Sequence, residues 1–331
     1  MESGPWSIDP DAALLHADAL VWDNHTCMPL RPDDSFLPQL QRFRDSGVNV
    51  VSVNIFFDTC IEWHDGVKVL AFMRKWIHER PDDYVLAASV DDILRAKKDG
   101  RLAVHFDIEG MEALDGEASL VRTYYDLGVR WMLIAYNRNN RAGGGCMDND
   151  SGLTDFGRRV IDEAARVGML VCCSHTGEQT CMDVFEHSQN PVLLSHSNPN
   201  ALCDHPRNVS DAVMSACAET GGLVGITGYG LFLENGDTSS DNIVRHIDYA
   251  VNLVGTEHVA LGMDYVFDIE ELKMFLENKE IFPFESTDRT MTSPEEMPAL
   301  TEALLRFGYP EETIRGILGE NLLRVARQVW K

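Results

Sequence analysis

Residues 168–196, GMLVCCSHTGEQTCMDVFEHSQNPVLLSH, contain two short apolar runs, and each of them ends in Ser-His. The runs, 168–173 and 191–194, have the length and composition of buried β-strands, and the longer stretch between them can return the chain to the same edge of a sheet. This alternation of short apolar runs with longer amphipathic stretches predicts βα units and a parallel sheet. The Ser-His pairs then follow the carboxyl ends of two strands.

The same alternation extends outward to both ends of the chain. Further strands are predicted over 19–24, 48–55, 102–107, 129–135, 222–227 and 258–263. Helical patterns lie over 39–45, 67–79, 91–98, 154–167, 209–219 and 242–253, and Ser89, Thr154 and Ser210 stand where N-caps are expected. Eight such units favour a closed α/β barrel of the TIM type, (β/α)₈, over the alternative of an open doubly wound sheet.

No repeat, low-complexity tract or Pro/Gly-rich linker divides the 331 residues. We therefore expect one domain over 1–331. Residues 270–297 lack a clear period and are expected to form a loop or lid, and 298–331 are expected to form C-terminal helices that close the fold.

Charge and targeting patterns narrow the class of protein. Fifty-three acidic residues against 28 basic ones give a formal net charge of −25, which disfavours binding to nucleic acid and to anionic membrane surfaces. No signal-peptide pattern and no apolar stretch of membrane-spanning length is present, so we expect a soluble cytoplasmic protein. Its eight cysteines follow no disulfide framework and are expected to be reduced thiols.

Several predicted strands end on groups that bind metals or move protons. The groups are His25, Glu109, His175, His196 and Asp264. In an α/β barrel the carboxyl ends of all strands meet at one face, where such enzymes react. Any one of these histidines alone is more often structural, but three at strand ends with a carboxylate at a fourth indicate a metal site. Imidazole with carboxylate suits Zn²⁺ first, then Mn²⁺, Co²⁺ or Fe²⁺.

Two further residues could serve catalysis. Asp264 could orient a ligand or take a proton from metal-bound water, and its alternative is a salt-bridged aspartate at the barrel rim. Arg207 could clamp a substrate carboxylate, and its alternative is a surface ion pair. The remaining histidines are expected to be structural, except that His105 could also support a ligand from behind.

Motifs along nearly the whole chain resemble the membrane (renal) dipeptidase family of zinc peptidases, peptidase family M19, in a bacterial-type cytosolic form. They are DNHT (23–26), FDIEG (106–110), GLTDFGRRVIDEAARVGMLVCCSHT (152–176), PVLLSHSNPNALCDHPRNVSD (191–211), LGMDYVFD (261–268) and ILGENLLRV (317–325). Their order and spacing together carry the resemblance.

The resemblance implies a binuclear zinc site in which Glu109 bridges two ions, His25 binds one of them, and His175 and His196 bind the other. It implies that Asp264 transfers the proton and that Arg207 holds the C-terminal carboxylate of the substrate. The implied reaction is hydrolysis, by metal-activated water, of the amide of a short peptide that often ends in a D-amino acid. The family also suggests a homodimer.

Three departures from the family pattern affect these implications. The first motif reads His25-Thr26-Cys27 where the family has His-x-Asp, so Cys27 could complete a pair of zinc ions, the site could hold a single zinc, or the thiol could stand unliganded near the mouth. Tyr136 replaces a histidine of the mammalian enzymes and could donate a hydrogen bond to the scissile carbonyl or only pack. Cys172 takes the place of a common aspartate.

Three hypotheses of function follow. The first is a zinc-dependent dipeptidase acting on a dipeptide or a similar small N-acyl amino acid. The second is a diverged relative that hydrolyses a non-peptide metabolite at a mononuclear site. The third, from a different class, is a binding protein without catalysis.

Overall fold

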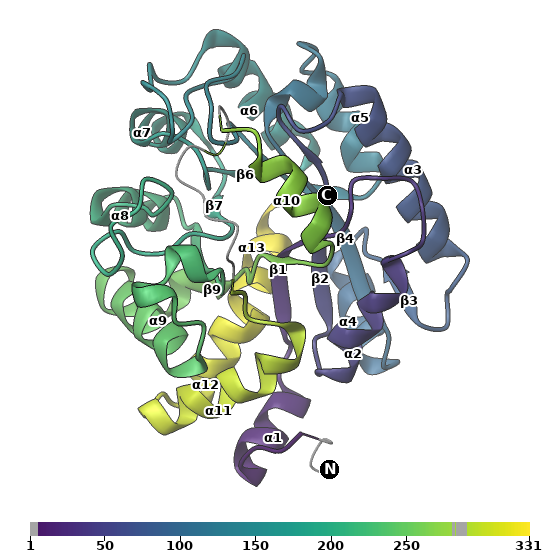
Figure 1. Cartoon of the computed structure of the whole chain (residues 1–331), viewed down its shortest axis with the longest axis vertical. Coiled ribbons are helices and arrows are strands. Elements are labelled where there is room, and N and C mark those ends of the chain that lie inside the picture. The colour runs from purple at the N-terminus through teal and green to yellow at the C-terminus, as the bar shows by residue number, and fades with distance from the viewer. Residues whose placement is uncertain (1–5, 280–281, 283–289) are drawn as a thin grey trace.

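The computed structural model describes residues 6–279, 282 and 290–331, and its centre is a curled, all-parallel β-sheet enclosed by helices (Figure 1). A strand lies at each of the eight places that the sequence predicts. They are β1 (Trp22–Cys27), β2 (Val50–Phe57), β4 (Leu102–Glu109), β5 (Val129–Leu133), β6 (Leu170–Cys172), β7 (Val192–Leu194), β8 (Leu223–Ile226) and β9 (Val259–Leu261). Two short strands, β3 (Tyr84–Leu86) and β10 (Tyr265–Val266), are additional.

The sheet closes on itself through the segment that contains β9 and β10. The strand order is β10-β1-β2-β4-β5-β6-β7-β8-β9, and only 262–264 separate β9 from β10. On one side the Gly262 N–H donates to the Ile226 carbonyl at 3.1 Å, and on the other the Asp264 N–H donates to the His25 carbonyl at 3.0 Å. One strand with a break thus bridges β8 and β1, and the predicted α/β barrel is confirmed.

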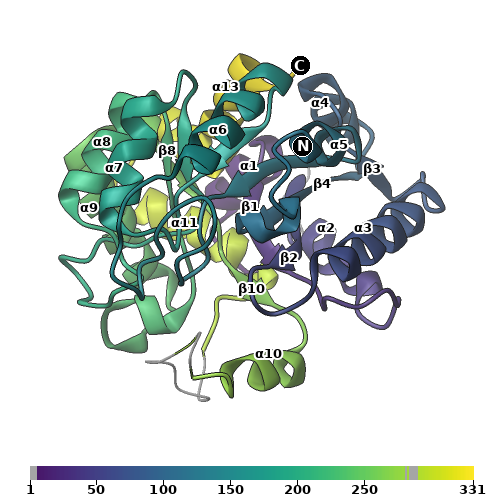
Figure 2. The same cartoon turned by 90° about the horizontal axis from the view of Figure 1, so that it is seen from above.

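Helices surround the barrel, with α3 and α5 on one flank and α7, α8 and α9 on the other (Figures 1 and 2). Before β5 the helices are α1 (Pro10–Asp18), α2 (Gln41–Asp45), α3 (Trp63–His78), α4 (Val90–Lys98) and α5 (Leu120–Asp126). After β5 they are α6 (Asp155–Val167), α7 (Glu178–His187), α8 (Asp211–Glu219), α9 (Ser240–Val254) and α10 (Ile269–Leu276). The chain continues with α11 (Met297–Phe307), α12 (Glu311–Arg315), a π-helical turn (Gly316–Glu320) and α13 (Asn321–Val329). The three predicted N-caps are confirmed, because Ser89, Thr154 and Ser210 each accept a backbone N–H at the start of α4, α6 and α8.

Two expectations need correction. The prediction of a loop over 270–297 is wrong for its first part, because α10 occupies 269–276; of the rest, 280–281 and 283–289 lie outside the described residues. The Asp268 side chain caps α10 by accepting hydrogen bonds from the N–H groups of Glu270 and Glu271 at 3.1 Å. An aspartate at this position is a typical N-cap, but without a clear apolar period after it no helix was predicted here. Strand β3 was also missed; it pairs with the first half of β4, below the place where β5 begins to pair.

Alternation along the strands divides the core into two parts. On β4, Leu102, Val104, Phe106 and Ile108 pack outward against the helices, while the alternate positions point into the barrel. The inward positions of β4 are Ala103, His105, Asp107 and Glu109. The polar ones among them therefore line the barrel axis, and Glu109, the last, is nearest the mouth.

An irregularity in β1 brings further side chains inward. Trp22 faces the barrel interior, where its ring lies 5.5 Å from that of His105. The pairing of β1 with β2 shifts register between Asp23 and Thr26, so His25 also points inward although it lies three positions after Trp22, where strict alternation would turn it outward. Below the mouth His105 is buried in the core, and its Nδ1 lies 3.2 Å from the Ser52 hydroxyl.

Two further observations bear on the sequence analysis. Among the described residues no helix is both long and apolar enough to cross a membrane. All eight cysteines are free, as expected.

A buried histidine makes the fold sensitive to acid. His16 on α1 contacts the Thr301 hydroxyl of α11 at 2.7 Å and the Ser46 carbonyl at 2.8 Å, and burial lowers its pKa from 6.5 to about 4. Because the unfolded chain binds this proton more readily, stability is complete above pH 6.5 and falls as the pH drops toward 4. From pH 7 to 4.5 the loss from this residue is about 2.5 kcal/mol.

We expect urea unfolding to show this loss in the wild type and a smaller one in His16→Gln, which cannot be protonated. The exposed His64 provides the control, His64→Gln, which should keep the wild-type pH dependence. Equal pH dependence in all three proteins would contradict the assignment.

Candidate metal centre

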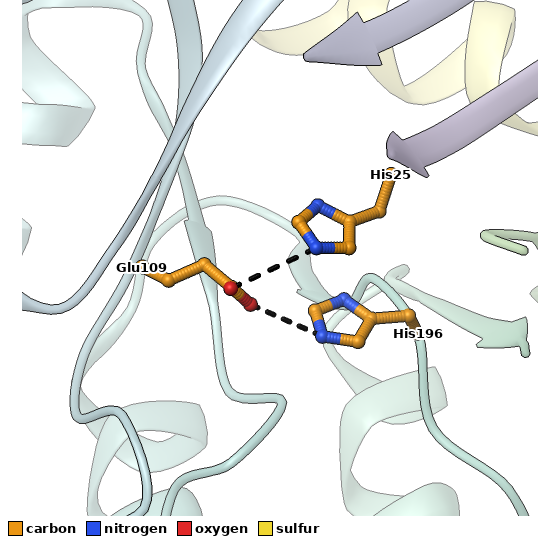
Figure 3. A group of neighbouring side chains, drawn as sticks. All are labelled: His25, Glu109 and His196. Carbon is orange, nitrogen blue, oxygen red and sulfur yellow. Dashed lines mark ion pairs between the residues drawn. The ribbon is translucent and has the colours of Figure 1, made fainter. Parts of the chain in front are cut away.

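Side chains from separate strands converge at the carboxyl end of the barrel. Glu109 ends β4, His25 lies in β1, and His175 and His196 follow β6 and β7 directly. The Glu109 carboxylate lies 3.7 Å from His25 Nε2, 3.5 Å from His175 Nε2 and 3.1 Å from His196 Nε2. Figure 3 shows the rings of His25 and His196 side by side, each directing a nitrogen at this carboxylate. The structure thus brings together all four residues.

Each imidazole is oriented by a partner on its other nitrogen. His25 Nδ1 lies 3.3 Å from the Asp107 carboxylate, and His175 Nδ1 lies 2.7 Å from the Asn137 side-chain oxygen. Because both partners accept hydrogen bonds, Nδ1 of each ring is placed to donate, and Nε2 is the atom directed at Glu109 that can bind a metal once it has no proton. Metal-binding histidines are commonly held in this way by a carboxylate or carbonyl oxygen behind them.

The converging atoms lack the hydrogens needed to satisfy one another. The Nε2 atoms of His175 and His196 are only 3.0 Å apart, and Glu109 Oε1 is buried with no hydrogen-bond partner among the described residues. Nitrogen lone pairs and a carboxylate in this arrangement repel unless a cation lies between them. His25, Glu109 and His196 offer three ligand atoms within 4.8 Å of one another, so the donor set fits a metal ion.

The pKa values of these groups reflect their burial and the carboxylates that surround His25. Burial raises the pKa of Glu109 to about 8 and also raises that of Asp264. Burial alone would lower the pKa of His25, but the carboxylates of Asp107 and Glu109 outweigh it and hold this pKa well above 6.5. Without a metal the centre would have to retain protons, and a divalent cation can replace them.

A second group of possible ligands adjoins the first. Cys27 Sγ lies 3.5 Å from His25 Nε2 and 3.8 Å from Asp264 Oδ1, and these three residues also offer ligand atoms within 4.8 Å of one another. Burial raises the pKa of the Cys27 thiol, so in the absence of a cation it is protonated and unreactive. The two groups share His25 and therefore adjoin each other; because one imidazole Nε2 binds one ion, two ions here would need a carboxylate such as Glu109 between them.

Backbone strain concentrates at the mouth. His175 and Asp264 both have left-handed φ, 61° and 60°. A conformation that costs energy in a residue with a side chain commonly marks a functional site. Here it turns His175 back over the end of its strand and aims Asp264 at His25, whose Nε2 lies 3.6 Å from its carboxylate.

Tyr136 and Arg207 occupy different positions relative to the mouth. The Tyr136 ring lies 4.3 Å from the His175 ring and lines the pocket at the mouth of the barrel, which Cys27, Glu109, His175 and Asp264 also line. Arg207 is 2% exposed and does not line this pocket; its guanidinium donates to the His196 carbonyl at 2.7 Å and the Ser197 hydroxyl at 3.3 Å. It also lies 5.4 Å from the ring of Phe232, which does line the pocket. The alternative of a surface ion pair for Arg207 is therefore wrong.

Sequence reasoning did not assign roles to the groups behind the ligands. Asp107 is held by the Ser52 hydroxyl at 2.5 Å and the Asn54 amide at 3.0 Å, and Asn137 holds His175. The place of Asp107 two residues before Glu109 on the same strand was a usable signal, because both then face inward. For Asn137 the sequence offered no such signal, since only the folded loop after β5 brings it to His175.

Cys172 has a structural environment. Its Sγ lies 3.0 Å from the Ser195 hydroxyl, and that hydroxyl lies 2.7 Å from His196 Nδ1. The thiol therefore supports the group that orients His196 and is too deep to reach the mouth.

Comparison with known proteins agrees with this centre. A family model described as membrane dipeptidase (peptidase family M19) matches residues 15–331. The chain is 32% identical to an uncharacterised protein in the pqqA 5′ region of Klebsiella pneumoniae, over 79% of this chain and 95% of that one. It is 27% identical to dipeptidase 3 of Rattus norvegicus, over 96% of this chain and 67% of that protein. A crystal structure of an amidohydrolase from Pseudomonas aeruginosa superposes with a TM-score of 0.89 at 29% identity, covering 96% of this chain and 99% of the other.

Proposed function

The chain belongs to the membrane dipeptidase family, peptidase family M19, and we propose from this premise that it is a zinc-dependent hydrolase of dipeptides or similar small N-acyl amino acids. The observation that carries the proposal is the meeting of three imidazole nitrogens on the buried Glu109 carboxylate. The name of the rat relative, dipeptidase 3, supports the substrate class.

The proposed metal positions are those that the family resemblance implies, and the distances of His25, His175 and His196 from Glu109 are compatible with them. His175, His196 and Glu109 would hold one ion, and His25 with Glu109 would hold a second, with Cys27 beside it. Bound zinc lowers the pKa of a coordinated water toward ~7 and so supplies a nucleophile at neutral pH.

Asp264 is proposed to move the proton. Its carboxylate lies 3.6 Å from His25 Nε2 and lines the pocket, so it reaches both the proposed metal position and a bound substrate. Burial raises its pKa, which brings the carboxyl closer to the working pH of a group that accepts a proton and later gives it to the leaving amine.

Tyr136 and Arg207 are proposed to act on the substrate. The Tyr136 ring stands against His175 at the pocket wall, where its hydroxyl can donate to the oxygen of the scissile carbonyl. Arg207 supplies positive charge behind His196 and Phe232, which attracts the substrate carboxylate to that side of the mouth.

Removal and return of metal test the proposed function. Protein treated with a chelator should lose hydrolysis of phenylalanyl-alanine, and added zinc should restore it, with product amino acids measured by chromatography. Hydrolysis that survives complete metal removal would contradict a metal-dependent reaction. No hydrolysis of any dipeptide by the zinc-loaded protein would instead favour the diverged, non-peptide substrate.

Cys27 is proposed as a ligand of the second ion, and cobalt substitution tests this. A thiolate bound to Co²⁺ gives a charge-transfer band in the near ultraviolet, so the band should be present in the wild type and absent in Cys27→Ser. A metal-bound thiol is deprotonated outright. The protonated state that we expect for Cys27 without metal therefore does not prevent it from binding the ion.

The matched control is Cys60→Ser, which removes another pocket-lining thiol and should leave the band in place. Cys27→Asp restores the family's usual ligand and should hold zinc at least as fully as the wild type. A band that persists in Cys27→Ser would show that Cys27 is not a ligand.

A further inference from the structure

One side of the pocket at the mouth of the barrel is built almost entirely of apolar side chains. It comprises the last residue of β2, a residue that follows β5, one face of α10, which crosses in front of the strands in Figure 1, and Phe282 beyond that helix. We call this set the α10 wall: Phe57, Tyr136, Leu272, Phe275, Leu276 and Phe282. An apolar surface beside a polar metal centre is unexplained by amide hydrolysis alone.

The α10 wall is continuous with the metal centre. From His175 the rings run to Tyr136 at 4.3 Å, from Tyr136 to Phe57 at 5.3 Å, and from Phe57 to Phe275 of α10 at 6.4 Å. A substrate whose amide reaches the metal ligands therefore places its neighbouring side chain directly against this surface.

The carboxylates near the wall share a single guanidinium, that of Arg31, which also pairs with Asp33 at 2.7 Å. Asp268 and Glu271 line the same pocket, and the Arg31 guanidinium lies 2.8 Å from the first and 3.3 Å from the second. Glu271 also accepts the Leu30 N–H at 3.0 Å. Among the described lining residues there is no lysine or arginine. An acidic side chain placed here would lose its water and meet carboxylates instead of a free cation, and a basic one would still lose its water against the apolar wall.

The two sides of the mouth differ in chemistry. In the closed barrel β2 and β7 lie across from each other, four strands apart in either direction. Phe57 and the α10 wall are on the β2 side, whereas His196 and Arg207 are on the β7 side. A substrate with its carboxylate toward Arg207 would direct its amino-terminal residue toward the α10 wall.

We propose that the site selects substrates whose amino-terminal residue, or acyl group, is bulky and apolar. This inference rests on the proposed function and names its substrate class. Burial of a leucine- or phenylalanine-sized side chain on the wall predicts kcat/KM values about 10- to 100-fold above those for glycine at the same position. Aspartate there should do no better than glycine, and lysine should remain below leucine and phenylalanine.

Two series of dipeptides test the selection in the zinc-loaded full chain. In the first the amino-terminal residue is glycine, leucine, phenylalanine, lysine or aspartate before alanine; in the second the same residues follow an amino-terminal alanine. Each is prepared with L- and D-configured carboxyl-terminal residues. The preference for bulky apolar groups should be present in the first series and weak in the second.

Variants on α10 assign the preference to the wall. Phe275→Ala should lower the ratio of kcat/KM for Phe-Ala over Gly-Ala by about tenfold, and Leu272→Ala should lower it in the same direction if the first variant folds poorly. Met274 lies on the same helix but is 69% exposed and does not line the pocket. Met274→Ala should leave the ratio unchanged.

The possible outcomes distinguish a failure of this inference from a failure of the proposed function. Hydrolysis that proceeds but favours glycine or charged residues, or that depends mainly on the carboxyl-terminal residue, would overturn the inference alone. An unchanged ratio in both Phe275→Ala and Leu272→Ala would do the same. Failure to hydrolyse any dipeptide would overturn the proposed function and the inference with it.

Discussion

Replacement of Glu109 by glutamine is expected to lower kcat/KM by on the order of 10³-fold or more, since a metal supplies several kcal/mol of transition-state stabilisation. Glu109 is 1% exposed and contacts all three imidazole nitrogens within 3.7 Å. Glutamine keeps the size of the side chain but loses the negative charge, and its amide group donates hydrogens toward nitrogen lone pairs. Metal content should therefore fall together with activity.

The control for this change is Glu112→Gln. Glu112 lies three residues further along the chain and outside the metal centre. Its carboxylate pairs with the Arg141 guanidinium at a distance of 3.3 Å. Elemental analysis and dipeptide hydrolysis should be close to wild type in this variant. Glu109→Gln protein with a full complement of metal would contradict the place of Glu109 at the centre of the site.

Replacement of Asp264 by asparagine is expected to lower kcat by about 10²- to 10⁴-fold, the usual contribution of proton transfer by a positioned side chain. Asparagine is the informative substitution because, like aspartate, it tolerates the left-handed backbone that residue 264 adopts. It cannot accept and return the proton. Substrate KM and metal content should change little.

Asp115→Asn provides a matched control, because Asp115 also has a left-handed φ, 45°, but its side chain is 53% exposed and does not line the pocket at the mouth. It should retain wild-type kcat. If Asp264→Asn loses metal in proportion to activity, Asp264 is a ligand, as its place in the second ligand group permits, and its role in proton transfer is wrong.

Strands were the most predictable part of the fold. Parallel strands buried on both faces are continuous apolar runs, so all eight barrel strands were visible in the sequence. Their bounds were less so: β1 was expected over 19–24 and lies at Trp22–Cys27, because its pairing with β10 at Thr26 and Cys27 extends it at the carboxyl end. That pairing joins residues more than 200 positions apart, which no local pattern contains.

Those residues of the site that lie at the ends of strands were predictable from the sequence. His25, Glu109, His175 and His196 follow or end strands, and the barrel brings such positions together. The α10 wall was not predictable, because α10 lies in the segment taken for a loop and its apolar face acquires a role only by crossing over Phe57. The same holds for the contact of Asn137 with His175.

The metal content of the protein, purified without chelator or added metal and measured by elemental analysis, tests the central claim most directly. We predict two zinc ions per chain, one at His175 and His196 and one at His25, with Glu109 shared. A single ion would contradict the paired site, and protein that contains no metal and takes up none from added zinc would contradict the account as a whole.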